Sequence, residues 1–296
     1  MPDDLSTAPL LDPRKFENPD ITADGQQRAV VGLTHLKTLW FNTGTLCNLT
    51  CVDCYIESSP TNDRLAYLST AEVLAYLDEI KSEGLNVEEI AFTGGEPFMN
   101  PDIVAMIDMS LKRGFNVLVL TNAMKPMHHK KAELLKLKQC YGDKLSLRIS
   151  IDHHTPEGHE ELRGPKSWEP MMAGLIWASS NGLNVAAAGR TRWDEGEDQS
   201  RKAYEALFQN RGIAIDANDP MALVLFPEMN ETLDVPEITT ACWDILDVRP
   251  DAMMCASSRM IVKRKGADRP VVTPCTLLPY DTQFELGHGL AEAAKS

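Results

Sequence analysis

The sequence predicts an α/β fold: a partial (β/α)6 barrel of the TIM-like kind, open on one side, followed by a small C-terminal α+β extension. Strand-like apolar runs alternate with helix-like stretches six times. Repeated strand–helix units imply a parallel sheet with helices outside it. The alternation stops near Glu228, where the composition changes. We therefore expect an irregular N-terminal segment over 1–35, the barrel over 36–228 and the extension over 229–296.

Each expected strand is a short apolar run. In chain order the six runs are 36–41, 87–92, 116–120, 145–152, 184–192 and 221–226. The first helix is expected to begin at a cap formed by Ser69 and Glu72 and to end at Gly84, because its apolar residues recur at helical spacing. The later helices are expected over 101–113, 131–138, 169–180 and 198–209.

Composition and charge exclude several classes of protein. The 296 residues carry a formal net charge of −14, which repels phosphate backbones and anionic membrane surfaces. No apolar run is long enough to span a bilayer, and no signal peptide is present. The odd number of cysteines, seven, fits a reducing compartment. We expect a cytoplasmic protein that binds small molecules or peptides, with no nucleic-acid or membrane partner.

Three cysteines follow the first expected strand with the spacing Cys47-x3-Cys51-x2-Cys54. One loop can place three thiolates around one inorganic centre. Such soft ligands suit iron–sulfur clusters or zinc, whose closed sites have four ligands, so three thiolates leave one position open for a small molecule. The alternatives are three buried structural cysteines, or a zinc knuckle completed from elsewhere in the chain.

This spacing resembles the cluster loop of the radical S-adenosylmethionine (radical SAM) enzymes. The resemblance implies that the three cysteines hold a [4Fe–4S] cluster, whose fourth iron binds the amino and carboxylate groups of SAM. It also implies that the reduced cluster cleaves SAM to a 5′-deoxyadenosyl radical, which takes hydrogen from the substrate. The chain departs from many members at Asp53, where they carry an aromatic residue near the adenine; here Tyr55 follows the third cysteine instead.

The second expected strand leads into the turn Gly94-Gly95-Glu96-Pro97. Two residues without a Cβ let the backbone approach a ligand, and a carboxylate can accept hydrogen bonds from an ammonium group. The turn is similar to the family's Gly-Gly-Glu-Pro motif, which contacts the amino group of SAM. Asn122 ends the third strand. Because ligands gather at the carboxyl ends of parallel strands, we expect the cysteine loop, this turn and Asn122 to line one cleft.

The resemblance implies further SAM-binding positions on the later strands. Ser150 and Asp152 match a Ser and an Asp that lie near the ribose and carboxylate of SAM in the family. Arg190 or Arg192 matches an Arg that binds the SAM carboxylate in several members. Alternation along a regular strand places both arginines on the same face. Structural salt bridges are the competing interpretation.

Three histidines follow the fourth strand, at His153, His154 and His159. The segment 159–164 is similar to a His-Asp-x-x-Arg-Gly stretch of family members that carry a SPASM-type C-terminal extension. The histidines could be metal ligands or acid–base groups. We favour solvated loop residues and helix-capping partners.

Cys255 and Cys275 bracket a predicted hairpin, and Cys242 lies in a short helical stretch before it. The arrangement resembles the start of a SPASM or twitch extension, which binds an auxiliary iron–sulfur cluster. The later cysteines of that pattern are absent before Ser296. An auxiliary site and packed thiols both remain open. The basic residues of this region are expected on a solvated hairpin face; they are Arg259, Lys263, Arg264, Lys265 and Arg269.

The favoured function is that of a radical SAM enzyme that abstracts hydrogen from a small molecule or a peptide side chain. Its cofactors are a [4Fe–4S] cluster and SAM, and its electron donor is of the flavodoxin or ferredoxin type. The N-terminus lacks an evident leader-peptide-binding domain, which favours a small molecule. The alternative is a non-catalytic iron–sulfur or zinc protein that binds or transfers electrons. The intact Gly-Gly-Glu-Pro turn argues against it, because an electron carrier needs no amino-acid-binding turn.

Overall fold

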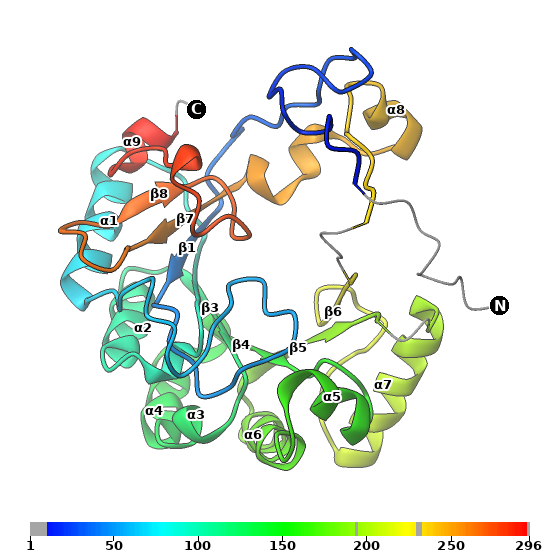
Figure 1. Ribbon diagram of the computed structural model, residues 1–296. Coiled ribbons are helices and arrows are strands. Elements are labelled where there is room, and N and C mark those ends of the chain that lie inside the picture. The colour runs from blue at the N-terminus through cyan, green and yellow to red at the C-terminus, as the bar shows by residue number, and fades with distance from the viewer. Residues whose placement is uncertain (1–10, 193–194, 229–232, 295–296) are drawn as a thin grey trace.

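The computed structural model describes residues 11–192, 195–228 and 233–294. Their strands are β1 (Thr38–Asn42), β2 (Glu89–Thr93), β3 (Asn116–Thr121), β4 (Leu145–Ser150), β5 (Asn184–Arg190), β6 (Leu223–Phe226), β7 (Ser258–Val262) and β8 (Val271–Thr273). They form one sheet with the order β6-β5-β4-β3-β2-β1-β7-β8. The first six strands pair in parallel and curve into an open arc (Figure 1), which confirms the predicted partial barrel.

Helices cover the outer, convex face of this arc (Figure 1). The longer ones are α1 (Thr70–Ser82), α2 (Ile103–Lys112), α4 (Lys131–Tyr141), α6 (Trp168–Ser180) and α7 (Glu197–Arg211). The expected cap of α1 is present, because Ser69 and Glu72 form a reciprocal capping box. The short helices are α3 (Lys125–His128), α5 (Pro156–Arg163), α8 (Cys242–Leu246) and α9 (Leu290–Ala293). The sequence did not predict α3, α5 or α9.

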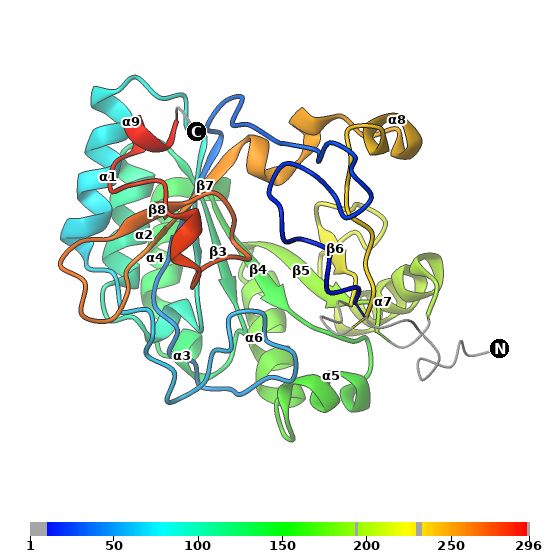
Figure 2. The same ribbon diagram turned by 45° about the horizontal axis from the view of Figure 1, so that its top comes forward.

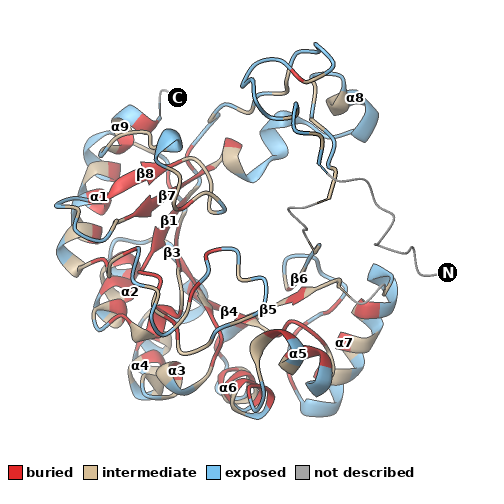
Figure 3. Cartoon of the chain, in the orientation of Figure 1, coloured by how far each residue is buried: buried red, intermediate tan, exposed pale blue. Residues whose placement is uncertain are grey.

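Alternation along the strands divides the apolar residues between two cores. Leu39 and Phe41 of β1 join the large core under the helices, whereas Trp40 between them joins a smaller cluster on the other face of the sheet. That cluster includes Leu118 of β3 and Met260 of β7. Figure 3 shows the buried residues concentrated on the strands and on the inner sides of the helices. The inner face beside β1 is therefore closed by side chains, and the carboxyl ends of the strands are left for a site.

The C-terminal hairpin continues the same sheet. β7 pairs in parallel with β1 and in antiparallel with β8. By contrast, α8 and the segment before it lie beside the N-terminal segment in both Figure 1 and Figure 2. Arg28 pairs there with Glu237, and Ala29 N donates to Ile238 O at 2.9 Å. The predicted boundaries at 35/36 and 228/229 stay a prediction.

Of the five basic residues of the hairpin, Lys263, Arg264 and Lys265 pair with acidic residues, Arg259 is buried and Arg269 is exposed. Lys263 and Arg264 each lie 2.6 Å from a carboxylate, of Glu72 and Glu285 respectively. Arg259 is only 4% exposed and donates to main-chain carbonyls, so the prediction of a solvated face is wrong for this residue. In the described part of the chain, no helix has the length and apolar character needed to cross a bilayer.

Candidate active site

The three motif cysteines lie on the long loop between β1 and α1. Figure 2 shows this loop at the same end of the sheet as α5. The loop is tied to its surroundings by main-chain hydrogen bonds: Val52 N donates to Leu162 O at 2.8 Å and Cys47 N donates to Ser59 O at 3.0 Å. All three thiols are free; Cys47 is buried, and the other two are partly exposed beside a hollow of about 290 Å³.

The chemistry of these thiols fits a metal cluster. Burial raises the pKa of Cys47 to about 12 and also raises the pKa of Cys51. The negative charge of the neighbouring thiolate adds to each shift, from Cys51 on Cys47 and from Cys54 on Cys51. Three thiolates side by side, one of them buried, need a compensating positive charge, which iron supplies directly. These residues could therefore hold a cluster that leaves one metal position open.

The Gly94-Gly95 pair lets the turn after β2 lie directly against the cysteine loop. Gly94 has φ +134°, and a Cβ there would lie 2.5 Å from Gly44 O. A Cβ on Gly95 would lie 2.2 Å from Leu46 O. Main-chain hydrogen bonds join the same segments, from Gly95 N to Gly44 O at 2.8 Å and from Glu96 N to Leu46 O at 3.1 Å. In the structure the two glycines thus let the turn approach the cysteine loop, and their contact with a ligand stays a prediction.

Glu96 is a buried carboxylate at the centre of this arrangement, with 1% of its surface exposed. Its Oε1 accepts hydrogen bonds from Phe98 N at 3.1 Å and Thr121 Oγ1 at 2.8 Å, and its Oε2 accepts one from Asn122 N at 2.8 Å. Burial raises the pKa of Glu96 to about 7, although these hydrogen bonds favour the charged form. A carboxylate oxygen can accept two hydrogen bonds, so Oε2 can take a further donor.

Asn122 joins the end of β3 to the cysteine loop. Its Nδ2 donates to Asn48 Oδ1 at 3.0 Å and lies 3.9 Å from Cys47 Sγ. The structure therefore brings together the cysteine loop, Glu96 and Asn122, as the sequence predicted. Ser150 ends the next strand and is half-buried.

Asp152 forms a buried ion pair with Arg163 at the end of α5. Arg163 Nε and Nη2 donate to its two carboxylate oxygens at 2.7 and 3.1 Å. Burial disfavours the charge of Arg163, but Asp152 and the Cys51 thiolate outweigh it, so its pKa is raised. The same positive charge opposes the rise in the pKa of Cys47 and Cys51. Sequence reasoning missed Arg163 as a site residue, although the stretch 159–164 had drawn attention to it.

Arg190 and Arg192 both reach the cysteine loop from the end of β5. Arg190 donates to Val52 O at 3.3 Å and to Asp53 O at 3.2 Å, and Arg192 Nη1 lies 2.9 Å from Asp53 Oδ2. Because Arg190 and Arg192 both contact Asp53, they lie on the same side of the chain, as the alternation along the strand predicted. Glu228 also pairs with Arg190, at 3.2 Å. In this structure the two guanidinium groups hold the loop, as the salt-bridge interpretation expects.

A family comparison covers the part of the chain that carries most of these residues. Residues 41–191, from β1 to the end of β5, match the model of the radical SAM superfamily. The chain belongs to the radical SAM superfamily. Members of this family are enzymes that use SAM and a [4Fe–4S] cluster, which are the cofactors that the resemblance implied for this chain.

Two curated relatives match the barrel region. The antilisterial bacteriocin subtilosin biosynthesis protein AlbA of Bacillus subtilis (strain 168) is 37% identical over 143 residues, which are 48% of this chain and 30% of AlbA. The AdoMet-dependent heme synthase of Methanosarcina barkeri is 30% identical over 132 residues, which are 44% of this chain and 35% of that protein. The matched part thus spans about a third of each relative's length.

A solved structure shares the fold. The crystal structure of Streptococcus suis SuiB bound to S-adenosylmethionine superposes with a TM-score of 0.61 and 13% identity, covering 86% of this chain and 64% of SuiB. SuiB bound to precursor peptide SuiA gives the same TM-score of 0.61, with 12% identity over 86% of this chain and 63% of SuiB. Both confirm the radical SAM fold of this chain.

The C-terminal cysteines of this radical SAM chain are only partly brought together. Cys255 precedes β7 and Cys275 follows β8, so the antiparallel pairing places both at the same end of the hairpin. Cys242 begins α8, which lies away from the hairpin in Figures 1 and 2. Cys242 Sγ contacts Thr239, whose main-chain N–H lies 3.3 Å away.

The histidines differ from the sequence prediction. His159 is fully buried and its ring packs edge-on against Trp168, and His153 is also buried, so the description as solvated residues is wrong for both. The capping role is confirmed for His153, whose Nδ1 lies 2.8 Å from the hydroxyl of Thr155, the N-cap of α5. This burial was missed because α5, the helix on which His159 lies, was not predicted.

Stability is expected to fall in mild acid because of His159. Burial lowers its pKa from 6.5 to about 4, so the unfolded chain takes up a proton in this range while the folded chain stays neutral. The stability that comes from keeping His159 neutral is fully present above pH 6.5. It is lost as the pH falls from 6.5 toward 4, at about 1.4 kcal/mol of unfolding free energy per pH unit. Urea unfolding at several pH values gives the free energy of unfolding as a function of pH, and between pH 6.5 and 4 this free energy should change less steeply for His159→Gln than for the wild type. An equally steep pH dependence in both proteins would contradict the prediction. The control His129→Gln, which replaces an exposed histidine, should keep the wild-type pH dependence.

Proposed function

We propose that this radical SAM enzyme abstracts hydrogen from a small molecule or a peptide side chain, using a cluster held by Cys47, Cys51 and Cys54. When bound, the reduced cluster and SAM supply the chemistry, which is one-electron cleavage of SAM to a 5′-deoxyadenosyl radical. The observation that carries the proposal is the convergence of three thiols, the Glu96 carboxylate and Asn122 at one end of the sheet.

The proposed SAM site is built from the ends of β2 to β5. Glu96 accepts the SAM ammonium group through Oε2, and Asn122 keeps the main-chain N–H that orients this carboxylate. Arg190 or Arg192 binds the SAM carboxylate, leaving its contact with Asp53. The remaining positions shape the pocket; they are Gly94, Gly95, Pro97, Ser150 and Asp152.

The substrate class and electron donor are part of the proposal. The names of the relatives point both ways, because AlbA takes part in bacteriocin biosynthesis and SuiB is seen with a precursor peptide, whereas another relative is a heme synthase. We propose a flavodoxin- or ferredoxin-type protein as electron donor. We also propose that Cys255 and Cys275 contribute to an auxiliary iron–sulfur site in the extension over 229–296.

The direct test is product formation by anaerobically reconstituted protein. With SAM and a reductant, the enzyme is expected to form 5′-deoxyadenosine. A cluster-loaded protein that forms none would favour the alternative, a non-catalytic iron–sulfur protein. Membership of a family of enzymes already favours catalysis over that alternative.

Glu96→Gln is expected to weaken SAM binding ten- to a hundredfold. Loss of one charge-assisted hydrogen bond in a shielded cleft costs about 1.5–3 kcal/mol. Gln keeps the volume and an acceptor for the donors on Oε1, whereas Ala would strand three protein donors. The dissociation constant for SAM, measured on cluster-loaded protein by calorimetry, checks the prediction.

The pH dependence of the same measurement sharpens the test. Because the pKa of Glu96 is about 7, wild-type affinity for SAM should rise as the pH increases through this value and the carboxylate becomes charged. The Glu96→Gln variant should lack this rise. The matched control is Glu88→Gln, at an exposed glutamate beside β2, which should bind SAM as the wild type does. Unchanged affinity and pH dependence in Glu96→Gln would exclude the assignment.

A further inference from the structure

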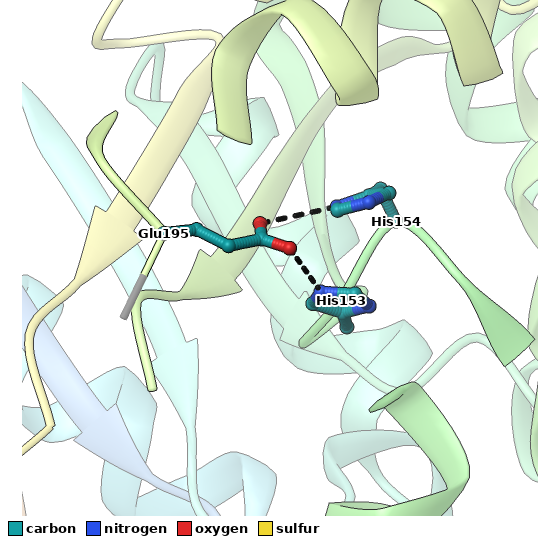
Figure 4. Close-up of side chains that lie close together, drawn as sticks. All are labelled: His153, His154 and Glu195. Carbon is teal, nitrogen blue, oxygen red and sulfur yellow. Dashed lines mark hydrogen bonds and ion pairs between the residues drawn. The ribbon is translucent and has the colours of Figure 1, made fainter. Parts of the chain in front are cut away.

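A second cluster of ligand-type side chains lies outside the cysteine loop. His153 and His154 follow the end of β4, and Glu195 lies in the segment between β5 and α7. Figure 4 shows both imidazole rings turned toward the one carboxylate. His153 Nε2 lies 3.3 Å from Glu195 Oε1, and His154 Nδ1 lies 3.7 Å from Glu195 Oε2. The two rings lie side by side, with centroids 4.0 Å apart.

These distances match the edges of a tetrahedral metal site. One ligand atom from each residue can be chosen so that all lie within 4.8 Å of one another. Zinc binds imidazole nitrogen and carboxylate oxygen at about 2.0–2.2 Å, which separates neighbouring ligand atoms by about 3.3 Å. Closing the cluster around an ion therefore requires shifts of a few tenths of an ångström up to about 1 Å.

His154 Nδ1 supplies an independent reason for a ligand. This nitrogen is buried and has no hydrogen-bond partner among the described residues. A buried polar atom without a partner costs free energy that a bound ion would recover. The ring itself is fixed, because it packs edge-on against Tyr204, whose hydroxyl donates to Ile151 O at 2.7 Å.

Neighbouring polar groups orient the other two ligands. Ser200 Oγ donates to Glu195 Oε2 at 3.1 Å. Thr155 Oγ1 lies 2.8 Å from His153 Nδ1 and can accept its proton, which leaves Nε2 free of hydrogen to bind a metal. Thr155 N also donates to His153 Nδ1 at 3.1 Å, so without metal the ring carries its proton on Nε2, toward Glu195. Metal binding at Nε2 moves the proton to Nδ1, which then donates to Thr155 Oγ1 instead of accepting from Thr155 N.

We propose that His153, His154 and Glu195 form a zinc-binding site at the rim of the barrel. Two imidazoles and one carboxylate suit zinc, as they also suit iron(II), and suit magnesium or calcium poorly. The ion joins the segment after β4 to the segment after β5. Arg192, which contacts Asp53 of the cysteine loop, lies three residues before Glu195 in the sequence. The proposal does not depend on the enzyme's substrate.

The test uses cluster-loaded enzyme dialysed against Zn²⁺ and then freed of loosely bound metal. Wild-type protein is expected to hold about one zinc per chain more than either His154→Ala or Glu195→Gln. Free thiols can also bind zinc, but they contribute equally to all variants. The matched controls are His129→Ala and Glu197→Gln, which remove an exposed histidine and a nearby exposed glutamate and should keep the wild-type zinc content.

A stability readout separates the site from structural damage. Zn²⁺ should raise the thermal unfolding midpoint of the wild type and both controls but not of Glu195→Gln, and Mg²⁺ should raise none of them. Equal zinc content in the wild type, His154→Ala and Glu195→Gln would overturn the proposal. So would an equal rise in midpoint for all proteins. Either result would leave the cluster as a hydrogen-bonded His–Glu pair, and neither bears on 5′-deoxyadenosine formation.

Discussion

Replacing Cys47, Cys51 or Cys54 by Ala is expected to abolish SAM cleavage. Each substitution removes one of three thiolate ligands, and the two that remain cannot hold a [4Fe–4S] cluster in place. The loop should keep its path, because it is tied by main-chain hydrogen bonds such as Val52 N to Leu162 O. Iron content after anaerobic reconstitution and 5′-deoxyadenosine formed with SAM and a reductant check this expectation.

Cys140→Ala is the matched control, because this free cysteine is exposed on α4. It should load iron and cleave SAM as the wild type does. If all three motif variants formed 5′-deoxyadenosine at the wild-type rate, the assignment of the cluster loop would be wrong.

A triple variant in which Cys47, Cys51 and Cys54 are all replaced by Ala tests the extension. About four iron per chain after anaerobic reconstitution would indicate an auxiliary [4Fe–4S] cluster, and none would leave Cys255 and Cys275 as thiols.

Arg163→Met is expected to lower the free energy of unfolding by about 3–5 kcal/mol. The variant leaves the carboxylate of Asp152 buried without its bidentate partner, and an unpaired buried charge is costly. It also removes the positive charge that favours the thiolates of Cys47 and Cys51, so cluster loading should fall as well. Anaerobic urea unfolding and iron content measure the two effects.

The second variant, Asp152→Asn/Arg163→Met, should recover part of the lost stability, because it removes both charges of the pair. Arg249→Met is the matched control: its ion pair with Asp251 at 2.9 Å is exposed, and because water screens such pairs, its loss should change the free energy of unfolding little. If Arg163→Met were no more destabilising than Arg249→Met, the pair would not stabilise this end of the sheet.

Most of the barrel could be predicted because its signals are local. The cap of α1 lies within four residues of sequence, from Ser69 to Glu72, and the strands were visible as short apolar runs. Helix α5 escaped prediction because its sequence is short and mostly polar, with Leu162 as its one large aliphatic side chain. The burial of His159 and the role of Arg163 at the site, which both depend on this helix, were therefore missed together.

Part of the candidate site could be predicted for the same reason. Cys47, Cys51 and Cys54 lie within eight residues, and Glu96 and Asn122 end successive strands of a parallel sheet. The roles of these residues toward SAM stay predictions. The sequence could not predict which charged side chains pair with one another at the site, for example Asp152 with Arg163 or Arg192 with Asp53. Contacts between distant segments carry no local signal.

The sequence by itself determined the parallel α/β class, since strand and helix periods are properties of short segments. Its cysteine spacing and its Gly-Gly-Glu-Pro turn carried the resemblance that implies the cofactors. Tertiary structure alone decided that β7 pairs with β1, that Asp152 binds Arg163, and that both strand-end arginines hold Asp53. It also decided that His154 faces Glu195. The physical reason is that these partners become neighbours only when the chain folds, so burial and charge compensation, which select among them, act only in the folded molecule.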